Sequence, residues 1–342
     1  MGTPQRRERG EEIEFMPRRV KFLGTGSYVP ERVLTNFDFE KLVDTSDEWI
    51  TERTGIKERR VAAENETTST LATAASQKAL EAAGVSPEEI DMIIVATITP
   101  DTIFPSTGCY LQKNLGCREI PAFDVLAACS GFIYACAIGK AMIESNSAGK
   151  VLVVGAECLT RITDYEDRGS CILFGDGAGA AVLGESNDES GFITCNLYSA
   201  YDEEGMMVLP AGGSKYPATQ ETVKNKMHYM RLKGRDIFRF AVIEMNNMLE
   251  RELSNNGIRM DDVKYIIPHQ VNMRILEAAA GRFNISMDKI YTNLDRYGNT
   301  SAASVPLALD EAVRKGLIEK GDLILMVAFG GGKTWASSLV RY

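Results

Sequence analysis

The chain has 342 residues, of which 44% are hydrophobic and 25% are charged, the mixture of an ordinary globular protein. Its formal net charge of −9 argues against nucleic acid as the main partner, because phosphate binding needs a basic surface. No apolar run approaches the roughly 18 residues of a membrane-spanning helix, so we expect no membrane partner. At roughly 150 residues per domain, the length predicts two units.

The first elements in chain order are a tail and a series of strands. Residues 1–18 are rich in Arg and Glu and have no apolar centre, so we expect a solvated, disordered tail and no signal peptide. Short apolar runs then alternate with helical patterns, which predicts βα units and a parallel sheet. The clearest predicted strands are residues 91–98, 122–128, 151–155, 263–267 and 323–329.

Cys129 follows the second of these strands, in Asp124-Val-Leu-Ala-Ala-Cys-Ser-Gly-Phe, and precedes a predicted helix from Phe132 to about Ile143. A tight turn of small residues between strand and helix is the arrangement that presents a nucleophile. The positive end of the helix dipole is expected to lower the pKa of the thiol. The competing interpretation of any free Cys is a small buried hydrophobic residue, which we expect for the other six.

Two stretches in the middle of the chain suggest structure more than chemistry. Phe174-Gly-Asp-Gly-Ala-Gly-Ala-Ala has the glycines of a dinucleotide site but neither a preceding strand nor a phosphate-binding helix. We expect a tight chain crossing near the core there. Residues 196–232 contain several Gly and Pro and are expected to form a loop excursion.

His269 and Asn299 lie at later strand-to-helix junctions, in Ile266-Ile-Pro-His-Gln and in Arg296-Tyr-Gly-Asn-Thr-Ser. The alternatives without a catalytic role are a structural histidine for His269 and a helix cap for Asn299. Junctions of this kind cluster at one edge of a parallel sheet, where ligands bind. The Gly-rich stretch Phe329-Gly-Gly-Gly-Lys-Thr-Trp ends a strand and could direct a backbone N–H at an oxyanion.

The two halves of the chain resemble each other. Gly84-Val-Ser-Pro-Glu-Glu-Ile-Asp-Met-Ile-Ile aligns with Gly257-Ile-Arg-Met-Asp-Asp-Val-Lys-Tyr-Ile-Ile at an offset of 173. The strands at Val151 and Leu323 match at 172, which pairs Cys129 with Ser301. We therefore predict an internal duplication, with an N-terminal half over 19–190 that carries the nucleophile and a C-terminal half over 191–342 that carries His269 and Asn299.

Cysteine usage bears on the compartment. The seven Cys are odd in number and show no CxxC or CxxH spacing, which disfavours a disulfide framework and a zinc site. Reduced thiols in a large α/β chain predict a cytoplasmic location.

These motifs, in this order, resemble β-ketoacyl-acyl carrier protein synthase III of the thiolase superfamily. The resemblance extends from about residue 20 to 342. The stretches that carry it are Asp44-Thr-Ser-Asp-Glu-Trp-Ile, Arg53-Thr-Gly-Ile, Ala127-Ala-Cys-Ser-Gly-Phe, Phe174-Gly-Asp-Gly-Ala-Gly-Ala-Ala, Pro268-His-Gln, Gly298-Asn-Thr-Ser-Ala-Ala-Ser and Phe329-Gly-Gly-Gly. Lys333 departs from the family pattern, which usually has an apolar residue there, and Val271 replaces a common Ala.

The resemblance implies a thiolase-like five-layer α/β/α/β/α fold built from two duplicated halves. It implies Cys129 as the acyl-accepting nucleophile, His269 and Asn299 at the decarboxylation step, and the backbone N–H groups of Cys129 and Gly331 as the oxyanion hole. The coenzyme A and substrate positions that it implies are Trp49, Arg53, Phe104, Arg168, Asn272 and Arg274. Arg274 would also meet the acyl carrier protein, and Phe104 would close the acyl pocket across a homodimer interface.

The reaction so implied joins an acyl-CoA, expected to be acetyl-CoA, to malonyl-acyl carrier protein by ping-pong transfer through Cys129. It needs no metal and no other cofactor. Thiolase itself is disfavoured because the last cysteine is Cys195, and the elongating synthases because His228 lacks their second histidine motif. Starter enzymes of polyketide or quinolone type, acyl transfer without decarboxylation and a non-catalytic scaffold remain as alternatives.

Overall fold

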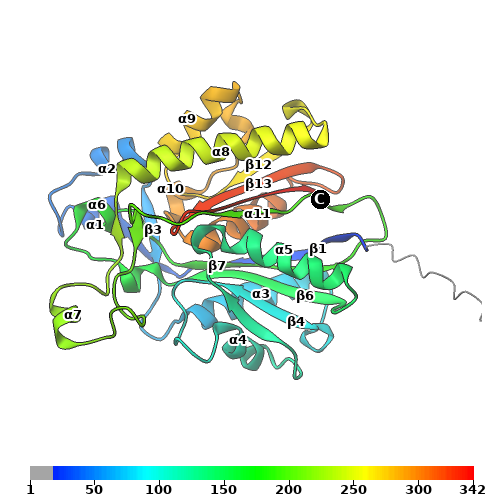
Figure 1. Cartoon of the computed structure of the whole chain (residues 1–342), viewed down its shortest axis with the longest axis horizontal. Helices are drawn as coiled ribbons and strands as arrows, with labels where there is room; N and C mark the ends of the chain where they lie inside the picture. Colours follow the sequence, from blue (N-terminus) through cyan, green and yellow to red (C-terminus); the bar gives the residue numbers. More distant parts are fainter. Residues whose placement is uncertain (1–17) are drawn as a thin grey trace, which may run out of the picture.

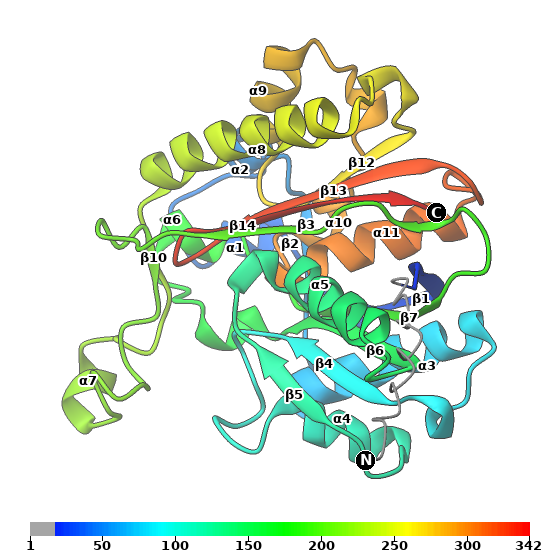
Figure 2. The same cartoon turned by 45° about the vertical axis from the view of Figure 1, so that its right-hand side comes forward.

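The structure, a computed structural model, describes residues 18–342. The tail predicted over 1–18 lies outside the described residues apart from Arg18, whose guanidinium pairs with the Glu185 carboxylate at 3.1 Å. Two β-sheets are stacked with helices between them and outside each (Figure 1, Figure 2). This is the layered α/β architecture that the sequence predicts.

The N-terminal sheet has the strand order β1-β7-β6-β4-β5. β4 is parallel to β5 and β6, whereas β7 is antiparallel to both β6 and β1. Its strands are β1 (Val20–Tyr28), β4 (Met92–Ala96), β5 (Ala122–Val125), β6 (Lys150–Glu157) and β7 (Gly177–Glu185).

The C-terminal sheet has the order β12-β13-β14-β8, and β9 also pairs with β14. Only β12 and β13 are parallel. Its strands are β8 (Gly191–Phe192), β9 (Asn196–Ser199), β12 (Tyr265–Pro268), β13 (Leu323–Gly330) and β14 (Thr334–Arg341). Two small hairpins lie apart from these sheets, β2 (Arg32–Thr35) with β3 (Glu58–Val61) and β10 (Met207–Val208) with β11 (Arg231–Leu232).

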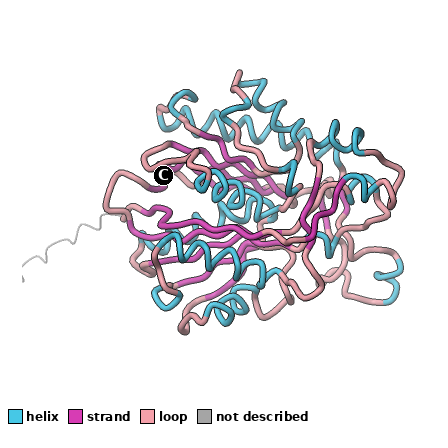
Figure 3. Tube along the Cα trace, turned by 180° about the vertical axis from the view of Figure 1, so that it is seen from behind, coloured by secondary structure: helices cyan, strands magenta, loops and turns pink. Residues whose placement is uncertain are grey.

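Five layers follow from how the helices pack. α5 and α11 lie between the sheets and contact strands of both, α3 and α4 cover the outer face of the N-terminal sheet, and α8 with α9 covers the C-terminal one (Figure 2). Figure 3 shows the two groups of strands from behind, with helices between them. The layer helices are α3 (Thr68–Ala83), α4 (Thr107–Leu115), α5 (Gly131–Glu144), α8 (Gly234–Asn256), α9 (Met273–Phe283) and α11 (Ser304–Arg314). Shorter helices are α1 (Asn36–Phe39), α2 (Asp47–Thr54), α6 (Arg168–Cys171), α7 (Gln220–Lys224) and α10 (Leu294–Tyr297).

The faces of the central helices that pack against the two sheets are apolar. Phe132, Ile133 and Cys136 of α5 share one buried cluster with Val305 and Leu309 of α11. This cluster continues onto the inner faces of both sheets. A helix that is buried over most of its surface is expected to be mostly apolar. The charged residues of α5 are confined to its C-terminal part, where Lys140 pairs with Glu144 at 2.7 Å.

The elements of one half recur in the other at an offset of 173 residues. α3 and α8 end at Gly84 and Gly257, both in left-handed conformation with φ of +62°. The 3-10 turn η2 (Ala128–Ser130) before α5 matches η6 (Ser301–Ala303) before α11, and β6 matches β13. The counterpart of Cys129 is therefore Ala302, and the pairing with Ser301 predicted from the sequence is wrong by one residue. The division at residue 190 itself stays a prediction.

The prediction of a parallel sheet is wrong for β7 and β14, which run antiparallel to every strand they pair with. An antiparallel return needs no crossover helix, and residues 158–176 between β6 and β7 contain only the 3-10 turn η3 (Leu159–Ile162) and α6. The glycine run before and within β7 marks a close crossing, as predicted. A Cβ on Gly175 would lie 2.3 Å from the Tyr297 carbonyl oxygen, and one on Gly179 would lie 2.6 Å from Pro306.

The loop excursion predicted over residues 196–232 begins later than expected, because residues 196–199 form β9. Within residues 18–342, no helix is both long enough and apolar enough to cross a membrane.

Candidate active site

Cys129 lies in the turn η2, where β5 leads into α5. Ala128 has φ of +46°, which turns the chain sharply and is uncommon for a residue with a side chain. A Cβ on Gly131 would lie 2.8 Å from the Ala96 side chain, so the start of α5 sits directly on β4. The small neighbours that the sequence shows are thus required by this packing.

The expectation of a lowered pKa for the Cys129 thiol is wrong for the structure. The residue is only 4% exposed, and burial raises the pKa of the thiol to about 12. The cause is desolvation, which disfavours the thiolate more strongly than its surroundings favour it. The resting nucleophile is a thiol, and its proton must be removed during the reaction.

His269 follows β12 directly, and its backbone N–H donates to the Val327 carbonyl at 2.8 Å. Its ring is buried edge-on against the ring of Phe329. Its Nδ1 shares a hydrogen bond of 2.7 Å with Ser304 Oγ. Burial lowers the pKa of the imidazole to about 3, so the ring is neutral near pH 7.

Asn299 has its amide fixed by one hydrogen bond. Its Oδ1 accepts from the Ser301 backbone N–H at 2.8 Å, which leaves the Nδ2 hydrogens as the free donors. Its backbone bridges to Phe174, and Gly298 before it has φ of +63° and lies against the Leu173 carbonyl oxygen. The side chain is therefore a preorganised hydrogen-bond donor.

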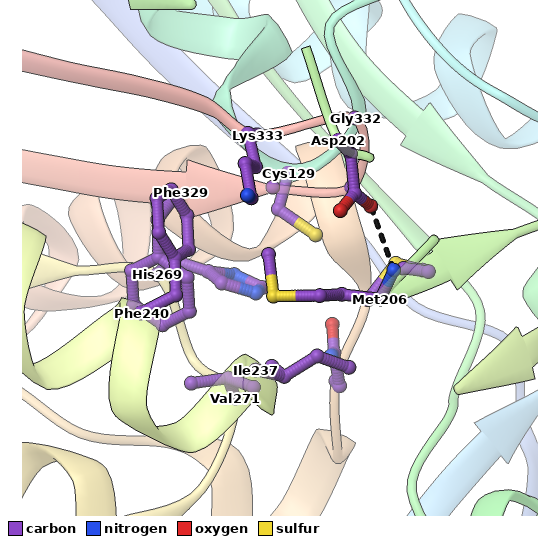
Figure 4. Close-up of a pocket in the computed structure, with 14 residues that line it drawn as sticks. Cys129, Asp202, Met206, Ile237, Phe240, His269, Val271, Phe329, Gly332 and Lys333 are labelled. Atoms are coloured by element: carbon purple, nitrogen blue, oxygen red, sulfur yellow. Dashed lines mark hydrogen bonds between the residues drawn. The ribbon is translucent and has the colours of Figure 1, made fainter. Parts of the chain in front are cut away.

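One cavity brings the three residues together. Cys129, His269 and Asn299 line it, with Gly331. Figure 4 shows the Cys129 sulfur, the His269 ring and the Met206 side chain directed into the same space. Its volume of about 20 Å³ is room for about one water molecule. The remaining lining residues are Asp202, Met206, Met207, Ile237, Phe240, Val271, Phe329, Gly330, Gly332 and Lys333.

The Gly-rich loop between β13 and β14 passes beside the nucleophile. A Cβ on Gly330 would lie 2.7 Å from the Cys129 nitrogen, and one on Gly331 would lie 2.9 Å from the Met207 sulfur. Backbone can therefore approach Cys129 only where side chains are absent. This placement supports the predicted oxyanion hole of Cys129 and Gly331 without testing it.

Lys333 does not disturb this loop. It has φ of +50°, and its carbonyl accepts from the Ala200 N–H at 2.9 Å. Its ammonium, 19% exposed at the side chain, pairs with the Glu204 carboxylate at 2.5 Å. The lysine therefore ties the Gly-rich loop to the segment 201–207, which forms one wall of the cavity.

The positions expected to bind coenzyme A gather on one surface. Two guanidinium groups lie against the Trp49 ring, with Arg53 Cζ at 4.6 Å and Arg168 Cζ at 4.9 Å from its centroid. Asn272 Nδ2 donates to the Arg53 carbonyl at 3.1 Å, and its Oδ1 caps α9 by accepting from the Arg274 N–H. Val271 of the cavity directly precedes Asn272, so this surface adjoins the site.

Phe104 is separate from these residues. It is 85% exposed and does not line the cavity of its own chain. Its expected role across a homodimer interface is untested and stays a prediction.

The chain is similar to known proteins over most of its length. The family model of 3-oxoacyl-[acyl-carrier-protein] synthase III matches residues 123–200, and that of its C-terminal part matches 253–342. A relative from Caldanaerobacter subterraneus subsp. tengcongensis, named β-ketoacyl-[acyl-carrier-protein] synthase III, is 55% identical over 94% of this chain and 97% of its own. The chain belongs to the 3-oxoacyl-[acyl-carrier-protein] synthase III family.

Relatives within and beyond this name agree in fold. A family member of the same name from Xanthomonas campestris pv. campestris is 50% identical over 96% of this chain and 100% of its own. The crystal structure of the Aquifex aeolicus enzyme superposes with a TM-score of 0.87 at 48% identity, covering 94% of this chain and 100% of that one. The priming β-ketosynthase of the R1128 polyketide pathway superposes with a TM-score of 0.85 at 34% identity, covering 95% and 96%.

Several residues of the site escaped the sequence analysis. Asp202, Met206 and Met207 come from the excursion, and Ile237 and Phe240 come from the first turns of α8. No local motif marks them, because only the long-range packing brings them to Cys129. Within residues 18–342, no group of three or more His, Cys, Asp or Glu side chains is arranged to hold a metal ion.

Proposed function

We propose that this chain catalyses the initiating condensation of fatty acid synthesis. An acyl-CoA, expected to be acetyl-CoA, reacts with malonyl-acyl carrier protein to give 3-ketoacyl-acyl carrier protein, coenzyme A and carbon dioxide. The observation that carries this proposal is the convergence of Cys129, His269 and Asn299 on one buried cavity in a chain of this family.

In the first half-reaction, Cys129 attacks the acyl-CoA carbonyl and stores the acyl group as a thioester. Coenzyme A leaves before the second substrate enters, so the kinetics are ping-pong. In this proposal the backbone N–H groups of Cys129 and Gly331 hold the oxyanion of each tetrahedral intermediate. The close approach of the Gly-rich loop to the Cys129 nitrogen supports this assignment.

In the second half-reaction, malonyl-acyl carrier protein loses carbon dioxide and leaves an enolate on its thioester oxygen. Asn299 donates from Nδ2, because its Oδ1 is already bonded to Ser301. His269 donates from Nε2 when its Nδ1 accepts from the Ser304 hydroxyl, which fixes the tautomer. A neutral imidazole suits this role, because decarboxylation needs a donor and no proton acceptor.

Substrate delivery uses the surface beside the cavity. Trp49, Arg53 and Arg168 offer an aromatic face and two cations to the adenine and phosphates of coenzyme A. Asn272 lines the channel for pantetheine, and the exposed Arg274 meets the acidic carrier protein. No metal or redox cofactor enters the balance, since loss of carbon dioxide drives the carbon–carbon bond.

A homodimer fits the exposed edge of the N-terminal sheet. β5 is the edge strand, and Leu126 directly after it is 80% exposed. Phe104, with Ile103 beside it, is equally open to solvent. An edge strand with large apolar neighbours is a pairing surface. We propose a second copy of this chain as its partner, which sedimentation equilibrium would test.

The alternative in polyketide or quinolone-type metabolism has weaker support. The polyketide priming synthase is 34% identical, against 55% for the relative from Caldanaerobacter.

All seven cysteines are free, which agrees with the cytoplasmic location that we propose.

Intact-protein mass spectrometry after mixing with a panel of acyl-CoAs tests the first half-reaction. We expect one acyl adduct on Cys129, with acetyl favoured, and release of carbon dioxide when malonyl-acyl carrier protein is added. Acylation without carbon dioxide release would favour plain acyl transfer. Wild-type protein that stays unlabelled, like Cys129→Ala, would indicate a scaffold.

A further inference from the structure

A buried carboxyl group that the reaction above does not use lies close to the nucleophile. Glu157, at the end of β6, is fully buried and forms no ion pair within residues 18–342. It accepts hydrogen bonds from Thr99 Oγ1 at 2.6 Å, Thr97 Oγ1 at 3.1 Å and the Ile98 backbone N–H at 3.1 Å. Burial raises the pKa of this carboxyl to about 7.

The turn that carries Ser301 lies between the elements that carry this carboxyl and the nucleophile. Ser301 Oγ is buried and has no hydrogen-bond partner. The turn η6, which begins at Ser301, packs against η2 with Cys129 and against β6, which ends at Glu157. In keeping with this position, the hydroxyl lowers the pKa of both the Cys129 thiol and the Glu157 carboxyl. An unpartnered buried hydroxyl lowers the stability of the folded state. Its presence in a native structure therefore calls for an explanation, such as a role in catalysis.

Backbone packing fixes the position of the turn that carries Ser301. The turn η6 packs against η2 on one side and against β6 on the other. A Cβ on Gly155 would lie 2.2 Å from the Ala302 carbonyl oxygen, and one on Gly131 would lie 3.6 Å from the Ala302 Cβ. Ala302, which directly follows Ser301, is therefore packed between the start of α5 and the end of β6.

The acylation step needs a proton acceptor that the three expected catalytic residues do not supply. The pKa of His269 is lowered to about 3 and that of Glu157 is raised to about 7, so the carboxylate is the stronger base for the Cys129 proton. His269 also has its Nδ1 engaged by Ser304. Glu157 is anionic over part of the neutral range and can accept a proton there.

We propose that Ser301 relays the proton of the Cys129 thiol to the Glu157 carboxylate during acylation. The inference rests on Cys129 being the acyl acceptor of the proposed function. In this relay Ser301 exchanges a proton with the reacting thiol, whereas Glu157 acts only through Ser301. The relay adds two residues to the first half-reaction and leaves the second to His269 and Asn299.

The step balances in protons and electrons. The S–H bond of Cys129 breaks as Ser301 Oγ takes that proton and passes its own to Glu157, which becomes a neutral acid. The thiolate forms a bond to the acyl carbon, and the carbon–sulfur bond to coenzyme A then breaks. The sulfur of coenzyme A leaves the acyl carbon as a thiolate. It takes the proton back from Glu157 through Ser301 Oγ.

The surroundings of Glu157 contain few other groups that titrate. Hydroxyls of Thr97, Thr99 and Ser301 face it, and the thiols of Cys129 and Cys158 feel its charge. Burial raises the pKa of the Cys158 thiol to about 12, so it stays protonated. The pH dependence of acylation near neutrality should therefore report on Glu157.

The test is the single-turnover rate of Cys129 acylation by acetyl-CoA, followed by mass spectrometry, in Ser301→Ala. The turn tolerates alanine, because Ala128 has nearly the same φ at the equivalent position. We expect acylation to slow by about 100-fold, a usual contribution of proton transfer. Decarboxylation of malonyl-acyl carrier protein should change little, because the Ser301 backbone N–H still holds Asn299.

Ser76→Ala is the matched control, since Ser76 Oγ on α3 is also buried and unpartnered. We expect it to acylate at the wild-type rate. Acylation of Ser301→Ala at the wild-type rate would overturn the relay, as would equal losses in acylation and decarboxylation. Wild-type protein that no acyl-CoA labels would instead overturn the proposed function.

A second measurement uses the pH dependence. We expect the wild-type acylation rate to rise through about pH 7 as Glu157 ionises and the rise to disappear in Glu157→Gln. A wild-type rate that is flat across this range would contradict the relay even if neither variant folds.

Discussion

The turn before α5 and the turn before α11 occupy equivalent places in the two halves of the molecule. Ala128 and Ser301 have φ of +46° and +48°, 173 residues apart. The same offset pairs Cys129 with Ala302, His269 with Ala96 and Glu157 with Gly330. Each of these three reactive groups has alanine or glycine at the equivalent position of the other half, whereas Asn299 corresponds to Leu126. A duplicated scaffold therefore supports a divided chemistry.

Packing explains why the counterparts are so small. Gly330 lies against the Cys129 nitrogen, and Ala302 lies against Gly155 and Gly131. Because the two turns touch each other, a large side chain in either would displace the other. The duplication therefore builds a single site from two half-sites.

The substitution with the largest expected effect is Cys129→Ala, which makes the first turn resemble the second. We expect complete loss of acylation by acyl-CoA, because the acyl group then has no acceptor. Mass spectrometry of the intact protein measures it. Cys109→Ala, which removes an exposed thiol, should leave the adduct unchanged; an adduct that persists in Cys129→Ala would identify a different nucleophile.

His269→Ala removes a donor of the second half while the first half stays intact. We expect malonyl decarboxylation to fall by about 100- to 1,000-fold, as when one preorganised donor is lost. Cys129 acylation should be largely retained. Carbon dioxide release and adduct formation measure the two steps separately, and parallel losses would contradict the division between the halves.

Arg274→Glu tests the outer surface of the second half. We expect the use of malonyl-acyl carrier protein to weaken by about tenfold, a loss typical of reversing one charge at a docking surface. Use of acyl-CoA should weaken less. Arg282→Glu reverses an exposed charge in the last turn of the same helix and should have little effect. Comparison of kcat/KM for both substrates decides, and equal losses would argue against docking.

Glu157→Gln gives the smallest expected effect, on stability. The folded-state pKa of Glu157, about 7, lies above its ordinary value of 4.5, so the folded protein binds the extra proton between these values. The stability of the wild type should therefore fall as pH rises from about 4.5 through about 7. At pH above 7 the variant should be more stable by on the order of 1 kcal/mol. Urea unfolding at two pH values measures this; equal stability would mean that Glu157 is not strained by burial.

Much of this architecture is readable from the sequence, because strands covered on both faces leave continuous apolar runs. β4, β6 and β13 occur where such runs predict them, and the motif residues that follow β5, β12 and β13 reach one cavity. β7 was missed because its glycines resemble a turn, although they serve close packing.

The remainder could not be predicted because it depends on distant contacts. Glu157 and Ser301 carry no motif, and only the packing of η6 on β6 brings them near Cys129. The expected pKa of the thiol was wrong for the same reason. The helix dipole can be inferred from local sequence, whereas the burial that outweighs it depends on the segment 201–207 and on α8.

Two methionines, Met206 and Met207, form part of the wall that leaves so little room beside Cys129. Methionine is unbranched and adapts its shape at low cost, unlike a rigid aromatic or β-branched residue. Space for an acyl group is therefore made by moving soft side chains. Discrimination among short primers should be graded with their length, without a sharp cut-off.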